Sequence, residues 1–229
     1  VIDEKGNLWI AKFPSCKDDS DIGGWEMVAH LMALDAGIEM GECKVQKFNS
    51  PHYTFMTKRF DRDRESTRIH FASAMTCLGK VDGAGASTGE SYLDIAAFIA
   101  TNGNQVNSDL EELWRRIVFS ICISNVDDHL RNHGFILTKK GWKLSPAYDI
   151  NPAPDGEGLK LNITETDNSQ SLATARSVTE YFRISPASSE KIIKKVVNSV
   201  LKWRVHAKAL GISAREQDHM ARAFRVAVE

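Results

Sequence analysis

The stretch Ser124–Pro152 most constrains how this chain can fold, because it has the pattern of a short hairpin between two polar segments. It reads S-N-V-D-D-H-L-R-N-H-G-F-I-L-T-K-K-G-W-K-L-S-P-A-Y-D-I-N-P. An apolar run at residues 135–137 is followed by Lys140 and Gly141, and then by residues 142–144. Apolar runs separated by a glycine-containing turn are typical of a β-hairpin. We therefore predict a hairpin whose two ends carry polar groups.

Asp127 and Asn132 precede this hairpin, and Asp149 follows it. Because a hairpin returns its second strand close to where the first began, we expect Asp149 to face Asn132. Carboxylate and amide oxygens suit Mg²⁺, which keeps waters and phosphates as its other ligands. Asp127 would lie beside that ion and accept a proton from an incoming hydroxyl. The order D-x-x-x-x-N, then a hairpin, then Asp is found in kinase catalytic loops. The alternative is that these residues cap turns through their side chains, which explains any one of them but poorly explains all three.

The composition is that of a soluble globular protein, with 42% hydrophobic and 26% charged residues among 229. A formal net charge of -1 gives no electrostatic case for binding nucleic acid or a membrane. We also expect no spanning helix and no signal peptide. The cysteines form no C-x-x-C pair, which favours reduced thiols in a cytoplasmic protein over disulfides or a zinc site. They are Cys16, Cys43, Cys77 and Cys122.

A lysine and a glutamate near the start of the chain point to the same chemistry. Residues 7–13 roughly alternate and predict a strand with Lys12 near its end, and residues 25–37 predict a helix with Glu26 at its start. Kinases hold a strand lysine over the phosphates with an acidic residue of the next helix. A solvated edge-strand lysine, and compensation of the helix dipole by Glu26, explain the same residues.

The other segments predict an α+β protein with a small β-rich lobe at residues 1–60 and a larger, mostly helical lobe at residues 61–229. Residues 79–89 are glycine-rich but match neither glycine motif for phosphate binding, so we expect a flexible loop there. Strands are predicted at residues 45–48, 53–59 and 159–163, and helices at residues 69–75, 91–100, from a cap at Ser108-Asp109, 171–182, 188–210 and 213–228.

Four motifs in order carry a resemblance to a known family. The runs N-V-D-D-H-L-R-N-H-G-F (residues 125–135) and L-S-P-A-Y-D-I-N-P (144–152) resemble the HipA-like serine/threonine kinases, the toxins of HipA–HipB toxin–antitoxin systems. W-I-A-K-F-P (9–14) and K-R-F-D-R (58–62) match the same family. The resemblance runs from about residue 8 to the end of the chain and implies a variant of the two-lobed protein-kinase fold.

The resemblance also implies roles for individual residues. Asp127 would be the catalytic base, Asn132 and Asp149 the Mg²⁺ ligands, and Lys12 would contact the α- and β-phosphates of ATP. Two further groups would complete the ATP-binding site. Lys58, Arg59 and Phe60 would lie against the adenine, mainly through backbone atoms, and the nucleotide pocket would also include His129, Leu130, Arg131, Asn132, Tyr148 and Asp149.

Family members phosphorylate protein serines, with translation components such as aminoacyl-tRNA synthetases as the known substrate class. They bind a helix-turn-helix antitoxin of the HipB type, and DNA only indirectly through it. Full-length members carry a glycine-rich phosphate loop with an autophosphorylated serine. Nothing ahead of Lys12 matches that loop, so we expect a fragment, or a short or split member, and no residue here is assigned as the autophosphorylation site.

Several alternatives stay open at this point. Asp128 is expected to point away from the site and bind loop amides, because adjacent carboxylates repel each other. His129 could brace the loop, and Tyr148 and Phe135 could belong to the core. A kinase-like binding module without turnover and a small-molecule kinase are the alternative functions. The basic residues near the C-terminus are expected to form a solvated helix face: Lys191, Lys194, Lys195, Lys202 and Arg204.

Overall fold

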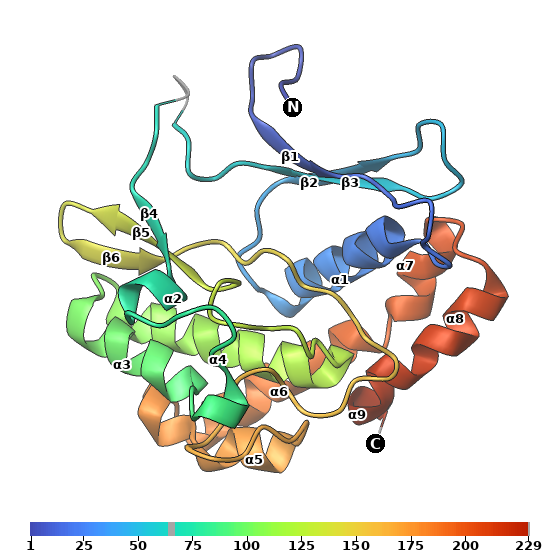
Figure 1. Ribbon diagram of the computed structural model, residues 1–229. Helices are drawn as coiled ribbons and strands as arrows, with labels where there is room; N and C mark the ends of the chain where they lie inside the picture. The colour runs from blue at the N-terminus through green and yellow to red at the C-terminus, as the bar shows by residue number, and fades with distance from the viewer. Residues whose placement is uncertain (64–66, 229) are drawn as a thin grey trace.

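The computed structural model describes residues 1–63 and 67–228 (Figure 1). Two antiparallel sheets of three strands each lie against a helical body in the described part of the chain. The strands are β1 (Trp9–Lys12), β2 (Cys43–Gln46), β3 (Thr54–Lys58), β4 (Phe71–Ser73), β5 (Gly134–Thr138) and β6 (Gly141–Leu144). The helices are α1 (Ile22–Ala36), α2 (Ala74–Cys77), α3 (Tyr92–Asn102), α4 (Val106–Ile123), α5 (Leu172–Ser177), α6 (Pro186–Val200), α7 (Trp203–Ala209), α8 (Ala214–Met220) and α9 (Arg225–Val228), with short 3₁₀ helices η1 (Ala86–Thr88), η2 (Thr179–Phe182) and η3 (Ala221–Phe224).

The predicted α+β class is confirmed. The first sheet has the order β1-β3-β2, and its register places Lys12 opposite Phe55. Helix α1 lies under this sheet in Figure 1 and also packs against α6 and α7. It begins at an Asp21 cap, whose carboxylate accepts hydrogen bonds from the N–H groups of Gly24 and Tyr53. The boundary at residue 60 between two lobes stays a prediction.

Gly23 lets α1 approach β3 closely. A Cβ atom built at Gly23 would lie 2.3 Å from the carbonyl oxygen of Tyr53, which is backbone and cannot turn away. We expect Gly23→Ala to lower the free energy of unfolding by about 1–3 kcal/mol, the usual cost of overpacking. Urea unfolding measures this, with Gly41→Ala as the control, because a Cβ there meets its nearest atom at 3.6 Å. Equal stability of the two variants would contradict this packing.

The central hairpin is confirmed and forms part of the second sheet, which has the order β4-β5-β6. Phe135 pairs with Leu144 and Leu137 with Trp142, and the turn is formed by Lys139 and Lys140, so Gly141, predicted in the turn, is instead the first residue of β6. Phe135 is buried in the core, as one of the alternatives held.

The core is continuous through α4, which runs between the other helices of the body. Its side chains at Leu113, Trp114, Ile117 and Phe119 are fully buried, in agreement with an apolar pattern nearly all round the helix. The helix ends at Ile123, and its C-cap residue Ser124 adopts a left-handed conformation with φ 51°. A rigid core helix therefore delivers the chain to the predicted catalytic loop.

Some predicted elements are wrong. The predicted helix at residues 69–75 is instead strand β4 followed by α2, because Phe71–Ser73 pairs with β5 and Ser73 then caps the helix. Helix α4 starts at Val106, and the predicted cap residue Asp109 is buried with its carboxylate accepting the N–H of Leu144.

Other differences concern the loops and the C-terminal part. Residues 159–163 form no strand, only an isolated bridge between Asn162 and Ser91. The predicted helix at residues 171–182 divides into α5 and η2, that at 188–210 into α6 and α7, and that at 213–228 into α8, η3 and α9. Backbone N–H groups at these interruptions form 3₁₀-type hydrogen bonds, such as that from Lys202 to the carbonyl of Ser199.

Within the described residues, no helix has both the length and the apolar character needed to cross a membrane. The cysteines are all free, as predicted. Of the C-terminal basic residues, Lys202 pairs with Asp35 and Arg204 with Asp218 at the surface, which fits a solvated face.

Candidate active site

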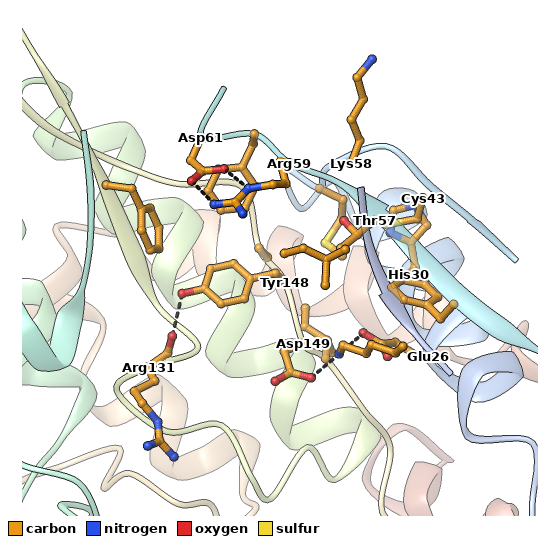
Figure 2. Close-up of a pocket in the computed structure, with 18 residues that line it drawn as sticks. Glu26, His30, Cys43, Thr57, Lys58, Arg59, Asp61, Arg131, Tyr148 and Asp149 are labelled. Atoms are coloured by element: carbon orange, nitrogen blue, oxygen red, sulfur yellow. Dashed lines mark hydrogen bonds and ion pairs between the residues drawn. The ribbon is translucent and has the colours of Figure 1, made fainter. Parts of the chain in front are cut away.

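Lys12 forms a charged cluster with two acidic residues from other parts of the chain, Glu26 and Asp149, which are labelled in Figure 2. Its Nζ is 2.6 Å from Glu26 Oε1 on α1 and 2.6 Å from Asp149 Oδ1 in the segment after β6. Asp149 has a left-handed backbone with φ 58°, and its Oδ1 also accepts the side-chain N–H of Asn151. Lys12 therefore pairs with both acidic residues. The alternative interpretation, a lysine solvated at the edge of a sheet, is wrong.

The cluster has one cation shared by two carboxylates. Burial raises the pKa of Glu26 to about 7, even though Lys12 opposes the shift, and the charge of Asp149 adds to it. Burial alone would lower the pKa of Lys12, but its two acidic partners outweigh that effect and raise it. When Glu26 is ionised, the two carboxylates carry one negative charge more than Lys12 neutralises, which favours an additional cation at the cluster.

Glu26 is expected to make stability depend on pH. Its folded pKa of about 7 lies above its ordinary value of 4.5, so between these values the native state binds more protons than the unfolded chain. The free energy of unfolding should therefore fall as pH rises through this window, by at most about 1.4 kcal/mol per pH unit. Glu26→Gln should flatten this dependence in urea unfolding, whereas Glu42→Gln, at an exposed pair with Lys58, should not. An unchanged slope in Glu26→Gln would contradict the assignment.

Hydrogen bonds join the loop before the hairpin to the segment after it. The hydroxyl of Tyr148 donates to the carbonyl oxygen of Arg131 at 2.6 Å. The N–H of Asn151 donates to Asn125 Oδ1 at 3.3 Å, and the N–H of Ala153 donates to the carbonyl of Ser124 at 3.2 Å. The hairpin thus returns the Asp149 segment alongside the Asp127 loop, as its pattern predicts.

Inside the loop, Asn132 and Asp127 are linked directly. The amide nitrogen of Asn132 donates to the carbonyl oxygen of Asp127 at 3.0 Å, and Asn132 is buried. The Asp127 side chain is exposed and forms no hydrogen bond or ion pair with another described residue. Its carboxylate is therefore free to meet a substrate group.

Asp128 is buried and points away from the site, as expected, but its partners are side chains and not loop amides. Asp128 Oδ2 accepts the hydroxyl of Tyr92 at 2.7 Å and that of Ser120 at 3.1 Å. Its Oδ1 lies 3.0 Å from Nε2 of His133. Burial alone would raise the pKa of Asp128, but attraction to His133 and these hydrogen bonds lower it. Asp128 fixes the loop to α3 and α4.

The last helix also supports the loop. The guanidinium of Arg225 in α9 donates to Ser124 Oγ at 3.1 Å and to the carbonyl of Gly156 at 3.2 Å, and it also contacts Gln170. Arg225 had no sequence signal, because its partners lie between 55 and 101 positions away in the chain.

A cavity of about 380 Å³ opens next to the charged cluster. Lys12, Glu26 and Asp149 all line it, and Figure 2 shows Glu26 and Asp149 close to each other at one end. Elsewhere it is mainly apolar, with Ile10, Met40, Phe55, Ala147 and Ile150 among its lining residues. An apolar cavity with a few convergent charges is the usual form of a small-molecule site.

Three aromatic rings form one wall of this cavity. The ring of Phe60 lies 5.6 Å from that of Phe71 and 5.7 Å from that of Tyr148, between centroids. Such a wall suits a flat aromatic ligand. The neighbouring N–H of Phe60 and carbonyl of Arg59 form no hydrogen bond with another described residue, so they can serve a ligand.

The side chains next to this wall are already engaged. Lys58 points away from the cavity in Figure 2 and pairs with Glu42 at 3.3 Å. Arg59 makes two hydrogen bonds to Asp61, at 2.8 and 2.6 Å. A ligand at this wall would therefore be contacted by backbone atoms. The family resemblance likewise implies that these residues contact adenine mainly through their backbone.

Most predicted nucleotide-binding residues lie together. Those lining the cavity are Lys12, Lys58, Arg59, Phe60, Arg131, Tyr148 and Asp149. His129 and Leu130 instead line a second cleft, which contains Asp127. The sequence analysis missed the apolar residues that line the cavity, and it also missed His30 and Asp61. Nothing in the local sequence pattern distinguishes these positions from ordinary core or surface positions.

The donor set for a metal is small. No group of three or more His, Cys, Asp or Glu side chains gathers within residues 1–63 and 67–228. Asn132 donates through its nitrogen, which leaves its Oδ1 without a partner there, and Asp149 Oδ2 is likewise without one. One amide and one carboxylate oxygen fit Mg²⁺, which takes few protein ligands and fills the rest with water and phosphate.

Comparisons with known proteins agree with this architecture. The chain is 34% identical over 167 residues to a Haemophilus influenzae protein named "Putative kinase", covering 67% of this chain and 48% of that one. It is 25% identical over 234 residues to "Putative kinase Y4dM" of Sinorhizobium fredii, covering 93% and 56%. The chain thus spans about half the length of these curated relatives.

Two solved structures share the fold. HipA of Shewanella oneidensis, solved in complex with HipB and its operator DNA, superposes with a TM-score of 0.71 at 17% identity, covering 96% of this chain and 57% of that one. The proinflammatory kinase CtkA of Helicobacter pylori superposes with a TM-score of 0.60 at 12% identity, covering 99% and 91%. The fold is therefore that of HipA-type kinases.

The model of the HipA-like C-terminal domain matches residues 1–204. The chain belongs to this family. Helices α8 and α9, which include Arg225, lie beyond the matched residues.

Proposed function

We propose that this chain is the kinase region of a HipA-like toxin, which binds Mg²⁺ and ATP and transfers the γ-phosphoryl group to a serine or threonine hydroxyl of a protein. The observation that carries the proposal is the Lys12 cluster at the charged end of the large cavity. A strand lysine paired with a helix glutamate, beside an aspartate that follows a hairpin, is the arrangement of protein-kinase sites.

The cavity would hold ATP with its adenine against the aromatic wall and its phosphates toward Lys12. The unpaired N–H of Phe60 and carbonyl of Arg59 would hydrogen-bond to the adenine edge. Lys12, kept charged by Glu26, would bind the α- and β-phosphate oxygens.

The residues of the Asp127 loop would carry out the transfer. The carboxylate of Asp127 would orient the acceptor hydroxyl and take its proton, while the hydroxyl oxygen forms a bond to the γ-phosphorus. The bond from that phosphorus to the bridging oxygen breaks, and ADP leaves. Asn132 and Asp149 would hold Mg²⁺, which neutralises charge on the phosphates.

The wider setting is proposed by analogy with the relatives. The HipA structure that shares this fold contains HipB and operator DNA. On this basis we propose a helix-turn-helix antitoxin as partner, with DNA contacted only through it, in the cytoplasm. A translation component such as an aminoacyl-tRNA synthetase is the proposed class of protein substrate.

Nucleotide binding is the direct test. Mg²⁺-ATP at millimolar concentration is expected to raise the melting temperature of the protein, because a ligand that binds only the folded state stabilises it. Asp149→Asn should abolish the shift, because it removes a carboxylate that holds both Lys12 and the metal. Differential scanning fluorimetry measures both.

Asp155→Asn is the matched control, because Asp155 lies in the same segment but pairs with Arg222 at the surface, away from Lys12. It should keep the full shift. No shift in the unchanged protein would refute nucleotide binding and favour a kinase-like module that docks an antitoxin without turnover.

A further inference from the structure

A second cleft, of about 200 Å³, lies beside Asp127. One side is the loop itself, through Asp127, His129 and Arg131. The lining also includes residues 81–84 of the glycine-rich segment and Lys160. The nucleotide site described above uses neither of these two segments.

Backbone hydrogen bonds to distant residues anchor the C-terminal end of the glycine-rich segment, which its composition predicts to be a flexible loop. The N–H of Ala86 donates to the carbonyl of Lys160 at 2.8 Å, and the N–H of Asn162 donates to the carbonyl of Glu90 at 3.0 Å. The backbones approach so closely that a Cβ at Gly85 would lie 2.7 Å from the Lys160 carbonyl oxygen. These contacts fix the backbone of Lys160, which lines the same cleft as Asp127.

Arg131 connects this cleft with the nucleotide cavity, because it lines both. Figure 2 shows its guanidinium extending away from Tyr148, and the guanidinium is paired with Asp82 at 2.5 Å. A group that reaches Asp127 through the second cleft thus lies next to the cavity that would hold ATP.

Some charged side chains in the cleft have an ion-pair partner among the described residues, and Lys160 has none. Asp82 and Arg131 neutralise each other. Lys160 is exposed and forms no ion pair with another described residue, and the stem of its side chain lies within van der Waals reach of a Cβ at Gly85. With Asp127 occupied by a hydroxyl, the ammonium of Lys160 is the charge left to recognise a substrate.

We propose that this cleft is the protein-acceptor site of the transfer reaction, and that it takes a serine- or threonine-containing segment with an acidic side chain close to the hydroxyl. The hydroxyl meets Asp127, and the acidic side chain pairs with Lys160. This inference rests on the proposed kinase function and adds the chemical class of the acceptor to it.

Peptide binding tests the assignment without requiring turnover. Two fluorescent peptides are compared that differ only in glutamate or lysine on both sides of one serine, using polarisation with and without Mg²⁺ and a non-hydrolysable ATP analogue. The protein is expected to bind the glutamate peptide about fivefold more tightly, which is the upper range for one exposed ion pair.

Lys160→Glu should reverse this preference. Lys140→Glu, at the exposed hairpin turn and not among the residues that line the cleft, should leave it unchanged. The same preference in Lys160→Glu as in the unchanged protein, or no binding of either peptide, would overturn the acceptor assignment.

The thermal shift with Mg²⁺-ATP separates the two proposals. Lys160 does not line the nucleotide cavity, so Lys160→Glu should keep the full shift. A retained shift together with absent peptide preference rejects the acceptor cleft and leaves nucleotide binding standing. An absent shift in the unchanged protein rejects the proposed function, whatever the peptides do.

Discussion

Asp127→Asn is expected to reduce phosphoryl transfer by about 10²–10⁴-fold while leaving Mg²⁺-ATP binding nearly intact, since this is the range that a positioned general base contributes. The Asp127 carboxylate is exposed, has no partner among the described residues and does not line the nucleotide cavity. Its loss should therefore spare nucleotide affinity. An amide of the same shape can still hydrogen-bond to a hydroxyl but cannot take its proton.

Transfer should be measured in the full-length protein, by following the γ-phosphate of labelled ATP into a protein acceptor. The thermal shift with Mg²⁺-ATP serves as the internal control for nucleotide binding. Asp155→Asn, in the exposed pair with Arg222, should transfer at the normal rate. Transfer at an undiminished rate in Asp127→Asn would remove Asp127 from the role of base.

The parts of the site that follow from local spacing could be predicted from the sequence. The hairpin at residues 134–144 follows from two apolar runs on either side of a short polar turn, and it carries Asp149 back toward the Asp127 loop. The pairing of Lys12 with Glu26 required only that a strand and the following helix pack together.

What could not be predicted depends on contacts between distant segments. Residues 71–73 have no strong preference of their own, and pairing with β5 makes them a strand. The C-terminal end of the glycine-rich segment is anchored by hydrogen bonds to residues 160–162, more than 70 positions away, which its composition does not indicate. The same holds for Asp128, whose partner Tyr92 is 36 residues distant.

Asp128→Ala is expected to lower the free energy of unfolding by about 3–5 kcal/mol, as removal of one partner from a buried charged network does. The change leaves the hydroxyls of Tyr92 and Ser120 without their acceptor and removes the carboxylate that lies 3.0 Å from His133 Nε2. Asp128→Asn keeps an acceptor oxygen but loses the charge next to His133, so its cost should be smaller, about 1–3 kcal/mol. Urea unfolding measures both variants.

Asp82→Ala is the matched control, because Asp82 is also paired with a cation but 74% of its side chain is exposed. Its cost should stay within about 1 kcal/mol. Equal losses for Asp82→Ala and Asp128→Ala would contradict the buried network.

The pH dependence of the same variants gives an independent check. The pKa of Asp128 is lowered from its ordinary value of 3.8, so the unfolded chain binds a proton there more readily than the native state. The stability that this carboxylate provides is present above pH 3.8 and is lost as pH falls toward its folded pKa. Asp128→Asn should therefore lose less stability than the unchanged protein on acidification below that value.

Since Asp128 follows Asp127 directly, the same buried contacts that stabilise the fold also hold the proposed base in position. Folded Asp128→Asn is therefore expected to show weaker phosphoryl transfer at normal nucleotide binding.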